Sequence, residues 1–193
     1  MPSDTRKRLM QAAFQRLYRD GFRNVAIDQI LGDVGISKTA FYKHFESKDD
    51  LLLAALQEHH RHMEDDFRAI MRQRGGEVPS RQLLALFDAV ENILETEHFH
   101  GCVFVNVAIE FPLPHEPAHQ VAASSKAAVE RVVTEVAAQA GAADPAALAQ
   151  ELCLIMEGAY VTKHVSGNPA TISIARRLAE RALAAHLPAM DCA

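Results

Sequence analysis

Apolar residues recur every three or four positions along almost the whole chain, and this spacing limits the fold more than any other feature. In the first such stretch, Leu9, Ala13 and Leu17 fall on one face of a helix. We find no convincing run in which apolar and polar residues alternate, as they would in a half-buried strand. The pattern therefore predicts an all-α fold.

Glycine, proline and capping residues divide this pattern into nine predicted helices. Gly35 and Gly141 each follow a helix, at a position where glycine tolerates the left-handed conformation that ends it. Asp144 and Asn168 each precede a proline, which is typical of an N-cap residue followed by the first helical position. The predicted helices span residues 4–20, 27–34, 38–45, 48–74, 79–94, 102–111, 118–140, 145–166 and 169–186. Three short or medium helices thus precede a bundle of longer ones.

Charge is distributed unevenly along the 193 residues, whose formal net charge is −5. Residues 1–48 hold nine Lys and Arg against five Asp and Glu, a net charge of +4, so residues 49–193 carry −9. A basic head on an acidic body favours a polyanionic partner for the head alone. Chance fluctuation of charge along a chain would produce the same imbalance, so charge by itself does not decide.

The chain has no signature of a membrane or secreted protein. No stretch approaches the roughly 18 to 20 uninterrupted apolar residues of a membrane span. Three scattered cysteines, Cys102, Cys153 and Cys192, suit a reducing compartment better than a disulfide framework. We therefore expect a soluble cytoplasmic protein.

Residues 34–37 join two short predicted helices in a helix-turn-helix. Gly35 permits the sharp turn, Ile36 fills the gap between the helices, and Ser37 is a good N-cap for the second. Helical spacing points Phe41 and Phe45 inward. The residues that it points outward are Lys38, Thr39, Tyr42 and Lys43. Such a face fits the major groove, because Lys can read guanine, a Thr methyl can meet a thymine methyl and Tyr can reach phosphate.

The first quarter of the chain closely resembles the DNA-binding domain of the TetR family of bacterial transcriptional regulators (TetR/AcrR type). The residues that carry this resemblance are Ala12-Ala13, Leu17, Gly21-Phe22, Ile27, Ile30, the run from Gly35 to Phe45 (GISKTAFYKHF), Ser47-Lys48 and Asp50-Leu51. The resemblance implies a helix-turn-helix DNA-binding domain at residues 1–48, followed by a helical effector-binding and dimerisation domain at 49–193. It also implies a regulator without catalytic activity or cofactor.

By the same resemblance, six residues match positions that touch bases or phosphates: Lys38, Thr39, Tyr42, Lys43, His44 and Lys48. One position departs from the family pattern. Ala26 stands where relatives usually place a Ser or Thr that caps the second helix and often donates to a phosphate. Alanine can do neither, so we expect the second helix to lack a side-chain cap.

A single helix-turn-helix reads too little DNA for useful specificity, so we expect a homodimer on a palindromic operator. The last two helices mix small and large apolar residues and form a natural four-helix seam between two copies. The predicted interface residues are Leu152, Ile155, Ala159, Ala175, Leu178 and Ala182. Burial inside one chain would account for part of each face equally well.

The family resemblance also implies an effector pocket in the middle of the bundle, whose occupation releases the operator. The candidate lining residues are Phe67, Phe87, Val90, Phe99, Cys102, Val103, Asn106, Met156 and Tyr160. Most are apolar, with a few polar side chains among them, which is typical of small-molecule pockets. We therefore expect a ligand-responsive regulator, most simply a repressor, with a small apolar or aromatic effector.

Three alternatives come from individual residues. Cys102 opens a predicted helix beside His98 and His100, so its thiol would suit a sensor of oxidants or electrophiles. An enzyme is less well supported, because no nucleophile elbow, phosphate loop or HExxH helix is present. A metal site is also less well supported, because His59 and His62 lack a third spaced ligand, and so do His98 and His100.

Overall fold

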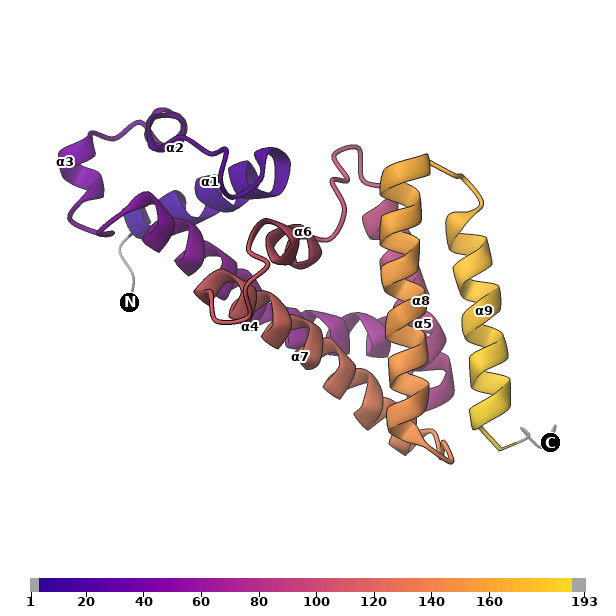
Figure 1. Ribbon diagram of the computed structural model, residues 1–193. Helices are drawn as coiled ribbons and strands as arrows, with labels where there is room; N and C mark the ends of the chain where they lie inside the picture. The colour runs from indigo at the N-terminus through magenta and orange to yellow at the C-terminus, as the bar shows by residue number, and fades with distance from the viewer. Residues whose placement is uncertain (1–3, 189–193) are drawn as a thin grey trace. The chain divides into compact units, whose positions relative to one another are not determined.

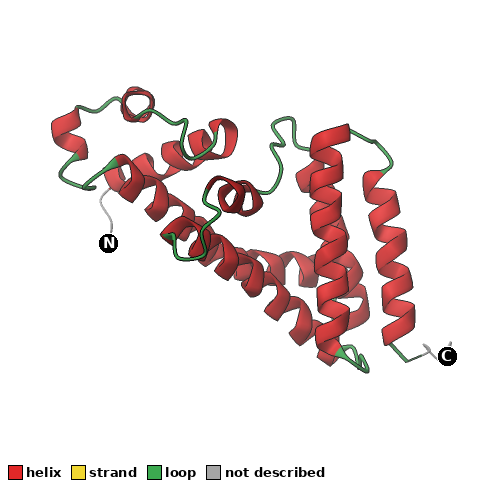
Figure 2. Ribbon diagram, viewed as in Figure 1, coloured by secondary structure: helices red, strands yellow, loops and turns green. Residues whose placement is uncertain are grey.

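The computed structural model describes residues 4–188, and over that range the chain forms nine α-helices joined by loops (Figures 1 and 2). The helices are α1 (Asp4–Asp20), α2 (Ile27–Val34), α3 (Lys38–Phe41), α4 (Lys48–Gly75), α5 (Pro79–Leu94), α6 (Val103–Glu110), α7 (Pro117–Gln139), α8 (Pro145–Ser166) and α9 (Thr171–His186). The all-α prediction is confirmed. Among these described helices, none has the length and apolar character required to cross a membrane.

Helix α3 is shorter than the predicted range of 38–45. Its α-helical part ends at Phe41, and residues 42–44 continue as turns. The His44 N–H donates to the Phe41 carbonyl at 2.8 Å, a three-residue spacing that tightens the chain beyond the helical pitch. The Phe45 N–H donates to the same carbonyl at 3.2 Å, so the turn still keeps Phe45 on the inner side, where it is buried.

Helix α9 begins two residues later than predicted, at Thr171 rather than Pro169. Asn168 does not cap the first helical turn. Its side-chain oxygen accepts from the Ala170 N–H at 2.9 Å, which makes a local turn ahead of the helix. At α8, by contrast, the predicted cap is present, because the Asp144 carboxylate accepts from the Ala147 N–H at 3.0 Å and Pro145 follows.

By packing, the described chain divides into two compact units. The first comprises residues 4–62 together with 103–125, and the second comprises 63–102 together with 126–188. Helices α4 and α7 each begin in the first unit and continue into the second. Because residues 103–125 belong to the first unit, α6 packs in the same unit as the helix-turn-helix. It follows that segment by about sixty residues in the chain. The domain boundary at residue 48, which the family resemblance implies, stays a prediction.

The core of the first unit forms where α1, α2 and α3 meet. Leu9, Ala13, Ile30 and Phe41 are completely buried there. Helix α2 ends because Gly35 adopts a left-handed conformation, with φ +72°, from which its N–H donates to the Leu31 carbonyl. This turn directs the chain into α3.

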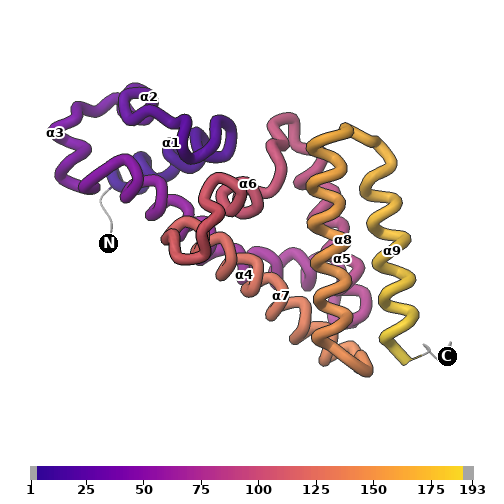
Figure 3. Tube along the Cα trace, in the orientation of Figure 1, coloured from indigo at the N-terminus to yellow at the C-terminus, as the bar shows by residue number. Residues whose placement is uncertain are grey.

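The second unit is a bundle built around one apolar cluster. In the trace of Figure 3, α8 and α9 run side by side, and α5 packs against both. Side chains from α5, α7, α8 and α9 fill the interior, among them Phe87, Val132, Leu148 and Leu152, all fully buried. Such a core resembles other helical bundles, in which facing apolar stripes exclude water.

Candidate nucleic-acid interface

Ser37, within the sequence GISKT, stabilises the turn that leads into α3. The Ser37 hydroxyl accepts from the Ala40 N–H at 3.2 Å, so it caps the helix as predicted. Phe41 is fully buried, while Lys38, Thr39, Tyr42 and Lys43 are exposed. Tyr42 is 60% exposed, an unusual position for an aromatic side chain that only served packing.

The other two predicted DNA contacts, His44 and Lys48, are half-buried. Lys48 begins α4, and its ammonium donates to the Arg23 carbonyl at 3.4 Å. Asp49 lies 3.8 Å from the same ammonium. Lys48 therefore lies against the loop between α1 and α2, a contact that sequence reasoning missed because 25 residues separate the partners.

Lys38 is engaged within the head. Its ammonium lies 2.9 Å from the carboxylate of Asp28 on α2. The hydrogen bond and the charge of Asp28 raise the pKa of Lys38. Both side chains are more than half exposed, and exposed ion pairs of this kind are weak in water. A phosphate or a base edge can therefore compete for this lysine.

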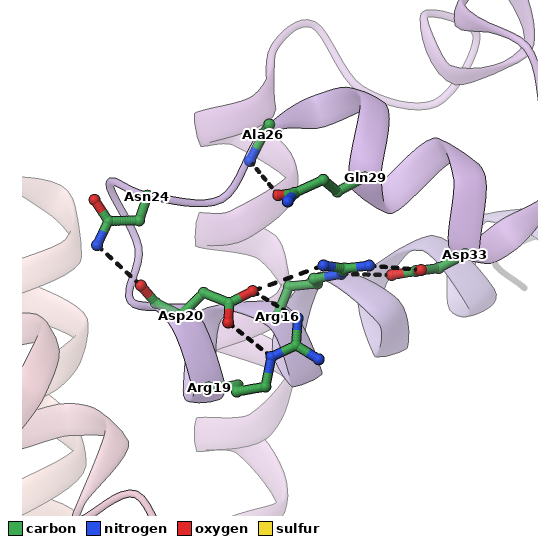
Figure 4. A network of polar contacts seen from close by, with 7 residues as sticks. All are labelled: Arg16, Arg19, Asp20, Asn24, Ala26, Gln29 and Asp33. Carbon is green, nitrogen blue, oxygen red and sulfur yellow. Dashed lines mark hydrogen bonds and ion pairs between the residues drawn. The ribbon is translucent and has the colours of Figure 1, made fainter.

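Helix α2 begins without a side-chain cap at Ala26, as predicted. The Gln29 side chain compensates in part, because its oxygen accepts from the Ala26 N–H at 3.0 Å (Figure 4). This is one half of a capping box, and the other half requires the acceptor that alanine lacks. The start of α2 thus has donors that the protein's own side chains leave to solvent or to a ligand.

Acidic and basic side chains tie α1 to α2 in a network drawn in Figure 4. The Arg16 guanidinium donates to both carboxylate oxygens of Asp33, at 2.7 and 2.8 Å, and lies 3.7 Å from Asp20. Arg19 makes a second two-point contact with Asp20. The hydrogen bond from Arg16 lowers the pKa of Asp33. Arg16 therefore links α1 to α2, whereas Arg19 pairs with its chain neighbour within α1.

Seven of the nine predicted effector residues gather in the second unit. Phe87, Val90, Met156 and Tyr160 are buried in its apolar cluster. Phe67, Phe99 and Cys102 are half-buried against the same cluster, and the Phe99 ring centre lies 6.1 Å from that of Tyr160. The remaining two, Val103 and Asn106, belong to α6 in the first unit.

Four of the six predicted dimer residues are buried within a single chain. Leu152, Ala159, Ala175 and Ala182 are at most 7% exposed in a single chain, so they have almost no surface to offer a partner. Ile155 is half-buried, and Leu178 is 42% exposed. The exposed large apolar side chains on these helices are Leu154, Val161, Val165, Ile174 and Leu178. Both helices have apolar residues on two faces, and periodicity alone does not say which face is inside.

The surroundings of Cys153 and His59 favour structural roles for both side chains. Burial raises the pKa of Cys153 to about 12, so this thiol is protonated at neutral pH. Cys192 lies outside the described residues. The His59 ring packs against the Phe14 ring, with ring centres 4.3 Å apart. In the described part of the chain, no group of three His, Cys, Asp or Glu side chains is placed to hold a metal ion.

Two segments of the chain match known protein families. A family described as bacterial regulatory proteins of the tetR family matches residues 9–55, and a tetracyclin repressor-like C-terminal domain matches residues 79–179. The transcriptional regulator YjdC of Escherichia coli is 24% identical over 175 residues, 91% of each chain. The transcriptional activator FasR of Mycolicibacterium smegmatis is 30% identical over 136 residues, which cover 67% of this chain and 56% of FasR. A TetR-family regulator from Streptomyces coelicolor superposes with a TM-score of 0.88 at 26% identity, covering 96% of this chain and 91% of that one.

Proposed function

Because the chain belongs to the TetR family of helix-turn-helix transcriptional regulators, we propose that it binds a palindromic operator as a homodimer and represses transcription until an effector binds. The family is one of DNA-binding regulators rather than enzymes. One observation carries the proposal for this chain. Phe41 anchors α3 from inside, while the side chains of Lys38 and Thr39 on α3 and of Lys43 in the turn after it are exposed.

The proposed contacts follow from the chemistry of each side chain. Lys38 and Lys43 donate to guanine O6 and N7, and the Thr39 methyl packs on a thymine methyl. Tyr42 and Lys48 donate to phosphates, which position the helix but carry no sequence information. His44 is assigned to the same surface and is half-buried there.

Two classes of variant test this assignment by fluorescence anisotropy on duplexes from upstream of the protein's own gene. Thr39→Ala or Lys43→Ala should lose about 1–3 kcal/mol of discrimination at particular base pairs. Lys48→Ala should weaken binding to all duplexes alike and reduce the salt slope by about 0.9 per half-site. If both classes of variant change all duplexes equally, the residues do not divide into base and phosphate contacts and the assignment fails.

The homodimer is supported by an apolar stripe on the outer face of α8. Leu154, Val161 and Val165 are separated by seven and four residues, so they lie on one face of the helix. Their side chains are 72%, 52% and 78% exposed. Gly158 lies on the same exposed stripe, and a side chain added there would meet nothing within 4 Å. Glycine inside a helix is destabilising, so its presence here favours close approach by a second helix.

The effector is proposed to bind among the apolar residues of the second unit. Phe67, Phe87, Phe99 and Tyr160 supply aromatic surface, which favours an apolar or aromatic ligand. The ligand acts by binding more tightly to the state that does not fit the operator, so it shifts the population away from DNA. A thermal-shift screen followed by operator release identifies such a ligand, since a true effector raises Tm and weakens DNA binding together.

The sign of regulation needs its own test, because one relative, FasR, is named an activator. A reporter fused to the bound promoter, in cells with and without this gene, decides between the two modes. Repression predicts higher expression without the protein. A fall in expression would assign the chain to activation.

A second candidate trigger is the Cys102 thiol. It is half-buried, packs against the apolar cluster of the second unit, and immediately precedes α6. An electrophile attached to this sulfur would disturb the same cluster that we assign to the effector.

A further inference from the structure

Glu110, the last residue of α6, binds the backbone of the loop between α1 and α2. Its Oε1 accepts from the Phe22 N–H at 2.9 Å, and its Oε2 accepts from the Arg23 N–H at 2.9 Å. One carboxylate thus receives two consecutive peptide donors that neither helix uses. Hydrogen bonds to a carboxylate are stronger than those between neutral groups.

The loop is shaped to receive this carboxylate. Gly21 has φ +83°, a conformation that favours glycine. A Cβ at this position would lie 2.9 Å from Glu110 Oε1, closer than carbon and oxygen normally approach. Gly21 is therefore required both for the turn after α1 and for the approach of Glu110.

Further contacts fix the same pair of segments. The Arg23 Nε donates to the Glu110 backbone carbonyl at 3.1 Å, and its guanidinium lies 4.6 Å from the centre of the Phe111 ring. The Phe22 and Phe111 rings meet edge to face, with centres 4.8 Å apart. Both the backbone and the side chains of residues 22–23 are held by the end of α6.

The backbone of Arg23, which Glu110 fixes at its N–H, also contacts Lys48 through its carbonyl. Glu110 accepts from the N–H of Arg23, and the carbonyl of Arg23 accepts from the Lys48 ammonium at 3.4 Å. The carboxylate therefore acts on Lys48 through one residue. Glu110 lies outside the segment, residues 9–55, that matches the family's DNA-binding domain.

We propose that Glu110 is a positioning residue for DNA binding, which holds the backbone of Arg23 so that Lys48, bound to the Arg23 carbonyl, is presented to an operator phosphate. This inference rests on the proposed function. Charge alone would predict the opposite effect, because a carboxylate near a phosphate-binding surface repels DNA. Removing Glu110 should therefore weaken binding even though it makes the protein less acidic.

The test is a double-mutant cycle on the full chain, with operator affinity measured by anisotropy at several salt concentrations. In the wild-type background, Glu110→Ala should weaken operator binding roughly tenfold and lower the salt slope by about 0.9 per half-site. In the Lys48→Ala background, Glu110→Ala should add less than about a twofold loss, because its route to the phosphate is already gone.

Glu116→Ala is the matched control. The Glu116 carboxylate accepts from the Leu113 N–H at 3.1 Å, so it makes a backbone contact in the loop after α6 but none to the loop between α1 and α2. Glu116→Ala removes the same negative charge as Glu110→Ala. This variant should bind the operator as tightly as the wild type or slightly tighter.

Glu110→Gln keeps the test decisive if the alanine variant does not fold. Gln has the same shape but offers one acceptor, and its NH2 group faces a peptide donor. We expect an intermediate loss of affinity, with faster hydrogen exchange at the Phe22 or Arg23 amide. Unchanged affinity in a folded Glu110→Gln protein would overturn the proposal.

Two other outcomes would overturn it. Glu110→Ala could bind as tightly as the Glu116→Ala control, or it could lose the same factor with and without Lys48. The second result would make Glu110 a general stabiliser of the fold. If the wild-type protein itself binds no operator, the proposed function fails instead, and that result is separate from either outcome.

Discussion

Leu154→Ala should dissociate the proposed homodimer without lowering the stability of the folded chain. Leu154 lies on the outer stripe of α8 and is 72% exposed in a single chain. Leu152, two residues away, is fully buried in the cluster of the second unit. Leu154 therefore marks the outer face of α8, and Leu152 marks its inner face.

The expected magnitude follows from exposure and symmetry. Truncating Leu to Ala removes about three carbons, worth about 0.8 kcal/mol each when they become buried. With about three-quarters of the side chain available to a partner, the loss is about 1.5–2 kcal/mol per copy. A two-fold interface contains the residue twice, so the dimer Kd should rise roughly 100- to 1000-fold. Leu152→Ala should instead lower the free energy of unfolding by about 2–5 kcal/mol.

Sedimentation velocity over a range of concentrations measures the dimer Kd, and thermal melting followed by circular dichroism measures stability. Ile109→Ala on α6 is a suitable control, because Ile109 is also 72% exposed but lies in the first unit. If Leu154→Ala and Ile109→Ala dissociate at the same concentration as the wild type, the outer stripe is not the interface. A dimer lost with Leu152→Ala alone would refute the assignment of faces.

Three smaller predictions concern the head and the thiol. Ser37→Ala removes the cap of α3 and should cost about 1 kcal/mol of stability, measured by denaturant unfolding, with a matching loss of operator affinity. Asp33 has a pKa below its ordinary value of 3.8, so its contribution to stability is complete above that value and is lost as pH falls through the lowered pKa. Asp33→Asn should therefore reduce the difference in Tm between neutral and strongly acidic solution, and an unchanged difference would show that the contact with Arg16 is not formed. If an alkylating electrophile releases DNA through Cys102, Cys102→Ser should resist it, whereas equal release from both proteins would assign the effector to non-covalent binding.

Much of the fold follows from local signals in the sequence. Helix ends at Gly35 and at Asp144-Pro145 depend on the backbone conformation and capping of a few neighbouring residues, so pattern reasoning finds them. The start of α9 was predicted wrongly because Asn168 forms a local turn, and a turn and an N-cap use the same side-chain oxygen.

Contacts between distant residues could not be read from the sequence. Glu110 reads as one more acidic residue at the end of a short helix, since nothing local marks the Phe22 and Arg23 amides as its partners. The two faces of α8 are hard to distinguish in the sequence for a related reason. Leu152 and Leu154 are the same residue type two positions apart, and only the packing of α5 and α9 distinguishes inside from outside.

The central claim is that the exposed face around α3 reads an operator, and equilibrium binding of the wild-type protein tests it most directly. Effector-free protein is titrated onto a palindromic duplex from upstream of its own gene and onto a scrambled duplex of the same composition, over 50–200 mM salt, a range that changes electrostatic DNA affinities by orders of magnitude. We predict a preference for the palindrome of about 10³-fold or more and a steep fall of affinity with salt. Equal binding to the two duplexes, or no salt-dependent binding to any palindrome near the gene, would contradict the account.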